Sequence, residues 1–188
     1  HLKHGPVKLI IGPWTHGQRS VSYAGDVEFG AAAPLDGALA RDYIALRVAW
    51  FDRYLRDMPS PDPLPAPVSY FMMGGGSGAK TPAGRLDHGG AWRTADQWPP
   101  AKTRPTAFFL NPRGALKDHA PDAPSSASFT FDPAAPTPTI GGAIASGAPV
   151  MAAGAFDQRE REDIFAATHP GRALADRPDV LVFETAPL

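Results

Sequence analysis

The chain has 188 residues, a formal net charge of −1 and 43% hydrophobic residues, the composition of an ordinary folded protein. The near-neutral charge gives no electrostatic case for binding nucleic acid or an anionic membrane, and the absence of cysteine excludes disulfides and thiolate metal sites. No apolar run approaches the roughly 20 residues of a membrane span, and 22 prolines with 19 glycines favour short strands and loops.

The first predicted element is a buried strand over residues 7–11, an apolar run (VKLII) that stops at a Gly-Pro pair. Residues 12–35 are predicted to form a loop that carries a histidine, His16, in the sequence GPWTHG. Residues 37–57 are predicted to form one amphipathic helix, with Asp36 as its N-cap. Because a single strand cannot form a sheet, its partner strands are expected upstream of this chain.

The predicted helix has two distinct faces. At 100° per residue its charged side chains share one arc, and its apolar side chains share the other. Leu46, Trp50 and Phe51 lie on the apolar arc and are expected to face a core. Arg47 points at the middle of the same arc, where a guanidinium group needs a partner. Its stem could lie along the core with the head at the rim, or it could pair with a missing part of the protein or with a substrate carboxylate.

A proline-rich stretch, PSPDPLPAP at residues 59–67, is predicted to be a stiff linker, because proline fixes φ and donates no backbone hydrogen bond. Four strands are predicted beyond it, and a closed β-sandwich needs about seven or eight. This part is therefore expected to be an incomplete β-domain. The predicted strands cover residues 68–73, 106–110, 128–131 and 180–185.

A glycine-rich stretch, MMGGGSGAKT at residues 72–81, follows a predicted strand, as a phosphate-binding loop does. The phosphate-loop pattern and the nucleophile elbow of hydrolases both require glycine where this chain has Ala79. The stretch is therefore predicted to be a turn between strands. The remaining histidines lack the spacing of a metal site, so no metal is expected.

His16 is the main candidate for chemistry. A histidine in a loop just after a buried strand is where α/β-hydrolases carry their general base. There the imidazole takes a proton from a serine, while a carboxylate holds its other nitrogen. A loop histidine with only a structural hydrogen bond fits the same placement. Asp26 or Glu28 could orient the ring, although the chain order of these enzymes puts the orienting carboxylate upstream.

Several phrases resemble the cocaine esterase/NonD group of serine hydrolases, which stands beside the X-Pro dipeptidyl-peptidases, α-amino-acid ester hydrolases and glutaryl acylases. KLIIGPWTHG, EFG and WFDRYLRDM carry the resemblance in the first part, and AWRTADQWPP, FFLNPRGAL, TFDPAAPTPTIGG and DVLVFETAPL resemble the group's C-terminal jelly-roll domain. The resemblance implies an α/β plus all-β fold. Residues 1–58 would be the C-terminal end of an α/β-hydrolase domain, 59–67 the linker and 68–188 an incomplete jelly roll.

The resemblance implies that His16 is the base of a Ser-His-Asp triad whose serine and aspartate precede this chain. The full-length protein is then expected to be a hydrolase of esters or amides without a cofactor, and this chain alone is expected to be inactive. Its implied partners are an ester or amide substrate and the upstream remainder of its own catalytic domain; self-association is left open.

Two further interpretations remain. Trp14 is expected to pack beside the histidine, with a role in lining the acyl pocket as the alternative. The alternative for the whole chain is a non-catalytic β-sandwich binding module of the carbohydrate-binding kind, with a helical N-terminal extension.

Overall fold

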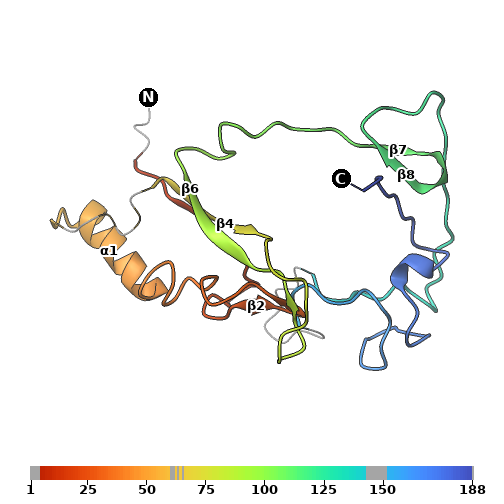
Figure 1. Cartoon of the computed structure of the whole chain (residues 1–188), viewed down its shortest axis with the longest axis horizontal. Coiled ribbons are helices and arrows are strands. Elements are labelled where there is room, and N and C mark those ends of the chain that lie inside the picture. Colours follow the sequence, from red (N-terminus) through yellow and green to blue (C-terminus); the bar gives the residue numbers. More distant parts are fainter. Residues whose placement is uncertain (1–4, 60–61, 63, 65, 143–151, 188) are drawn as a thin grey trace. The chain divides into compact units, whose positions relative to one another are not determined.

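A computed structural model describes residues 5–59, 62, 64, 66–142 and 152–187 of the chain. They form short strands, one α-helix and two 3₁₀ helices (Figure 1). They divide into two compact units, of which unit 1 comprises His1–Lys102 with Gly141–Phe156 and unit 2 comprises Thr103–Ile140 with Asp157–Leu188. No helix in these described ranges is long and apolar enough to cross a membrane.

A mixed three-stranded sheet in unit 1 has the order β1-β4-β6. Strand β1 (Leu9–Ile11) runs parallel to β4 (Val68–Met73), and β4 is antiparallel to β6 (Gly90–Ala95). The bounds of β4 are those predicted from the sequence. Strand β1 is not alone in this chain, because β4 pairs with it from beyond the proline-rich stretch; further partner strands upstream stay a prediction. A strand has two hydrogen-bonding edges, and its own residues do not say which segment takes either edge.

The second sheet of unit 1 takes two of its strands from the predicted loop and the third from much later in the chain. It has the order β2-β3-β5, and it consists of β2 (Tyr23–Ala24), β3 (Val27–Glu28) and β5 (Leu86–Asp87). The prediction of an uninterrupted loop over residues 12–35 is therefore wrong. Gly25, with a φ of 65°, makes the tight turn between β2 and β3.

An aromatic cluster forms the core of unit 1. Phe29 and Phe71 meet edge to face with ring centroids 6.2 Å apart, and Phe71 meets Trp92 in the same manner at 5.5 Å. Ala24 and Ala33 complete the buried cluster, against which Trp92 packs. Residues from the loop after β1 and from the sheet β1-β4-β6 thus share one core, so the sheet fixes the base of that loop.

Helix α1 (Tyr43–Leu55) begins later than predicted. Its N-cap is Asp42, whose carboxylate accepts a hydrogen bond of 2.6 Å from the backbone N–H of Ala45. Asp36, the predicted N-cap, instead accepts the N–H of Tyr43 at 2.8 Å from outside the helix. Both aspartates therefore satisfy N–H groups of the first turn, and sequence spacing alone did not distinguish the true cap from the distant one.

Unit 2 contains one regular hairpin. Strands β7 (Phe109–Asn111) and β8 (Ala115–Lys117) are antiparallel and are joined by the 3₁₀ turn η1 (Pro112–Gly114), and a second 3₁₀ helix, η2 (Leu174–Asp176), lies further along the chain. The strand predicted over 106–110 corresponds to β7, which begins three residues later, at Phe109. The predictions of strands over 128–131 and 180–185 are wrong, apart from one bridge between Glu184 and Ala115. Strand-like composition does not make a strand where no neighbour offers a ladder of hydrogen bonds.

A buried carboxylate organises the loops of unit 2. The side chain of Glu160 is fully buried, and its Oε2 accepts the backbone N–H groups of Thr168 at 2.7 Å and His169 at 2.9 Å. Its Oε1 accepts Nε of Arg172 at 2.7 Å and lies 3.4 Å from Arg177. Burial raises the pKa of Glu160, but these hydrogen bonds and the charge of Arg172 outweigh burial and lower the pKa to about 2.

Arg177 extends this network to two further segments. It binds the carboxylate of Asp179 through two nitrogens, at 2.7 and 2.8 Å, and it donates to the carbonyl oxygen of Ala135 at 2.8 Å. Asp179 also accepts the hydroxyl of Thr137 at 2.7 Å. Unit 2 is therefore held together by a buried ion network in addition to its short strands.

Candidate active site

The loop that carries His16 starts directly after β1. A Cβ added to Gly12 would stand 2.5 Å from the indole ring of Trp14, so only glycine allows the indole to fold back over this position. The indole nitrogen of Trp14 donates to the carbonyl oxygen of Ala33 at 3.0 Å, and its ring lies 5.6 Å from that of Trp92. These contacts account for Trp14 as a packing residue; its role in an acyl pocket stays a prediction.

His16 stands exposed in a tight turn. The N–H of Gln18 donates to the carbonyl oxygen of Thr15 at 3.1 Å, and Gly17 takes a φ of 79°. The His16 ring makes no hydrogen bond to any residue of the described ranges. Both ring nitrogens are therefore open to partners, which is what a general base and its orienting carboxylate require.

The two nearby carboxylates of the same loop do not hold the ring. Glu28 accepts the N–H of Gly30 at 3.1 Å, and Asp26 lies in the exposed turn between β2 and β3. Neither is hydrogen-bonded to His16. Within the described residues, neither carboxylate therefore takes the place of the triad carboxylate.

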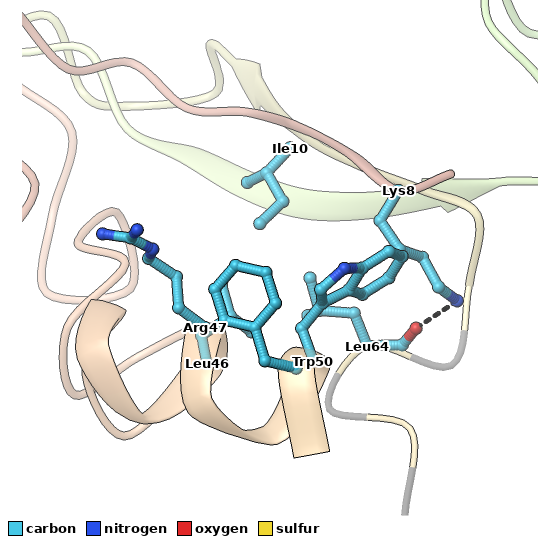
Figure 2. Close-up of a pocket in the computed structure, with 7 residues that line it drawn as sticks. Lys8, Ile10, Leu46, Arg47, Trp50 and Leu64 are labelled. Atoms are coloured by element: carbon cyan, nitrogen blue, oxygen red, sulfur yellow. Dashed lines mark hydrogen bonds between the residues drawn. The ribbon is translucent and has the colours of Figure 1, made fainter. Parts of the chain in front are cut away.

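An apolar pocket of about 180 Å³ lies between α1 and β1 (Figure 2). Lys8 and Arg47 stand at opposite ends of it in the close-up. Lys8 donates to the carbonyl oxygen of Leu64 at 2.5 Å and pairs with the carboxylate of Asp62 at 2.9 Å. The pocket is lined by Lys8, Ile10, Leu46, Arg47, Trp50, Phe51 and Leu64.

Within the described part of the chain, Arg47 lies with its stem along the pocket; pairing with a missing part of the protein or with a substrate carboxylate stays a prediction. Its side chain lies along the pocket, and its guanidinium carbon stands 5.5 Å from the ring centroid of Tyr43. It forms no ion pair with the part of the chain described here. The stem thus covers apolar surface while the charged head reaches the rim.

The apolar arc of α1 is only partly covered. Leu46 and Trp50 are half-buried against the pocket, and no residue of α1 is fully buried by the described part of the chain. The expectation that this arc faces a core is therefore met only on its pocket side. A stripe at helical spacing remains exposed, to 73% at Ile44, 52% at Val48, 44% at Phe51 and 74% at Leu55.

The glycine-rich loop after β4 is a closed turn, as predicted. The N–H groups of Gly76 and Gly78 donate to the carbonyl oxygens of His88 and Asp87, each at 2.9 Å. The hydroxyl of Ser77 donates to the carboxylate of Asp87 at 2.7 Å. The backbone N–H groups of Gly76 and Gly78 are therefore already used within the turn. In the described ranges no three metal-ligating side chains are grouped to hold an ion.

Comparison with known proteins places the chain in a family. Residues 64–188 match the X-Pro dipeptidyl-peptidase C-terminal non-catalytic domain. Cocaine esterase of Rhodococcus sp. (strain MB1 Bresler) is 28% identical over 146 residues, which are 73% of this chain and 22% of the esterase. The chain thus spans about a fifth of the length of this curated relative. No solved structure matches the chain.

These matches confirm the resemblance drawn from the sequence phrases and do not favour a carbohydrate-binding module. They support a β-rich C-terminal domain in the second part of the chain. Because the family model matches more than half of its length, the chain belongs to the family of X-Pro dipeptidyl-peptidase C-terminal domains.

Proposed function

We propose that this chain is the C-terminal part of a serine hydrolase of ester or amide bonds, and that His16 is the general base of its Ser-His-Asp triad. The observation that carries the proposal is the placement of His16. It stands exposed in a turn directly after β1, with both ring nitrogens free of partners in the described part of the chain. The relative that is named an esterase supports the reaction class.

The proposed chemistry is acyl transfer in two steps. One nitrogen of His16 takes the proton of a serine hydroxyl as the serine attacks the acyl carbon, and it then gives that proton to the leaving alcohol or amine. Water repeats the sequence and releases the acid. A carboxylate bonded to the other nitrogen keeps the imidazole in the tautomer that accepts the proton. The remainder of the full-length chain supplies the serine and the carboxylate.

The proposed domains are the end of an α/β-hydrolase domain at 1–58, a linker at 59–67 and a jelly-roll domain at 68–188. A parallel strand followed by a helix, as in β1 and α1, suits the first of these. Strand β1 lies at an edge of its sheet in the described part of the chain, so a sheet of the catalytic domain can continue there. The compact units divide the described residues differently, and these boundaries stay a prediction.

A fluorophosphonate probe tests the proposal directly. We expect the full-length protein to react with the probe and to hydrolyse p-nitrophenyl acetate. Mass spectrometry should place the adduct on a serine outside residues 1–188, because none of the serines that the structure describes is bonded to His16. Residues 1–188 alone should not exceed the background rate. An adduct on a serine of this chain, or turnover by this chain that His16→Ala abolishes, would contradict the proposal.

The exposed stripe of α1 supports the proposed partner, which is the upstream part of the same protein. Apolar side chains at i, i+4, i+7 and i+11 form the buried face of a helix in a folded domain. We expect a cysteine placed at Ile44 or Leu55 of the full-length protein to react slowly with a maleimide. Arg41→Cys is the matched control, because its side chain is 83% exposed just before the same helix. Equal reaction rates at the three positions would rule out coverage of the stripe.

A further inference from the structure

We propose that Arg19, Ser20 and Asp36 are positioning residues for His16, and that they act by anchoring its loop to the first turn of α1. The inference rests on the proposed role of His16 as a base. Because the ring makes no hydrogen bond of its own in the described ranges, only the loop backbone fixes the place of the His16 side chain's attachment point in this part of the chain.

Asp36 joins the loop to the helix through its two carboxylate oxygens. Oδ2 accepts the hydroxyl of Ser20 at 2.7 Å, and Oδ1 accepts the N–H of Tyr43, the first residue of α1, at 2.8 Å. A carboxylate at this end of a helix is favoured by the helix dipole, and a hydrogen bond to an ionised oxygen is stronger than a neutral one. The segment from His16 to Ser20, with three residues between them, is thus tied to a regular element.

Arg19 makes a second, independent connection to the same turn. Its guanidinium carbon lies 4.0 Å from the centroid of the Tyr43 ring, a stacking distance for a cation on an aromatic face. Its Nε is buried and has no hydrogen-bond partner in the described part of the chain, so stacking is what holds the group. The backbone carbonyl of Arg19 accepts the N–H of Leu35 at 2.8 Å.

Trp14 fixes the other side of the loop through its bond to Ala33 and its contact with Trp92. Only Thr15, His16, Gly17 and Gln18 lie between the two anchors, and they form the turn described above. His16 is therefore held at the tip of a short, doubly anchored turn. An error of about 1 Å in the place of a reacting group can cost on the order of 100-fold in rate, so loosening one anchor should reduce catalysis.

The test uses the full-length enzyme with p-nitrophenyl acetate. We expect the double variant Arg19→Met, Ser20→Ala to lower kcat by about tenfold or more, with KM and Tm unchanged. Ser20→Thr, which keeps the hydroxyl, should by itself leave kcat at the level of the unmodified enzyme. Ser77→Ala is the matched control, because it removes a hydroxyl–carboxylate bond of the same 2.7 Å length outside the His16 loop. Arg41→Met is a second control: it removes an exposed arginine just before α1, and kcat should not change.

Two outcomes would overturn the inference. A double variant with normal kcat shows that the anchor does not position the base. A fall in kcat that is accompanied by a fall in Tm, or that the Ser77→Ala control reproduces, shows a general effect on the fold. Failure of the inference is distinct from failure of the proposed function. If His16→Gln abolishes turnover while the double variant is fully active, His16 is the base and the anchor is irrelevant.

Discussion

Replacing His16 with glutamine in the full-length protein should lower kcat for ester hydrolysis by at least about 10³-fold. Base, nucleophile and orienting carboxylate act as one unit, so loss of the proton acceptor disables all three. The melting temperature should not change, because the exposed ring makes no bond within the described part of the chain. KM should change little, since the ring acts on a proton and not on ground-state binding.

The matched control for this experiment is His119→Gln. His119 is also exposed, and its Nδ1 already lies 2.9 Å from a carboxylate oxygen of Asp118, which makes it the more triad-like histidine by local geometry. It lies in the family's non-catalytic domain, so its replacement should leave kcat unchanged. A near-normal kcat for His16→Gln, with an unchanged melt, would make His16 a bystander.

Glu160→Gln should lower the free energy of unfolding of unit 2 by about 3–5 kcal/mol. Glutamine has nearly the same volume and can still accept the backbone N–H groups of Thr168 and His169. It cannot neutralise Arg172, and Arg177 loses one of its two carboxylate neighbours. Chemical denaturation, followed by a probe of the C-terminal domain, measures the change. Glu162→Gln, an exposed carboxylate two residues away, should have no measurable effect.

The same carboxylate makes stability depend on pH. The pKa of Glu160 is about 2 in the folded chain against 4.5 for an ordinary glutamate, so the folded state binds its proton less readily than the unfolded state. Its contribution is complete above pH 4.5 and is lost as the pH falls from 4.5 towards 2. Asp179, whose pKa is lowered by its hydrogen bonds from Arg177 and Thr137, acts in the same direction. Glu160→Gln should flatten the acid side of the stability curve; an unchanged slope would exclude Glu160 as its source.

The sequence predicted best where the signal was local. The strand at 68–73 combines a proline-rich boundary with an apolar, aromatic run, and the structure places β4 at those residues. The periodicity predicts the helix, but the predicted start at residue 37 lies before the observed start at Tyr43. Asp36 and Asp42 are both suitable caps by residue type, and local sequence does not show that Asp36 instead binds the hydroxyl of Ser20 and the N–H of Tyr43.

Sequence patterns were enough to predict the family, the apolar arc of α1, the turn character of the glycine-rich loop and the place of His16 just after a strand. These features depend on residues close together in the chain, so pattern and turn chemistry suffice. The folded chain was needed to show that β4 pairs with β1, that residues 128–131 form no strand, and that Glu160 contacts Arg172 and Arg177. Each of these features depends on contacts between segments that are far apart in the sequence, and local composition does not predict such contacts.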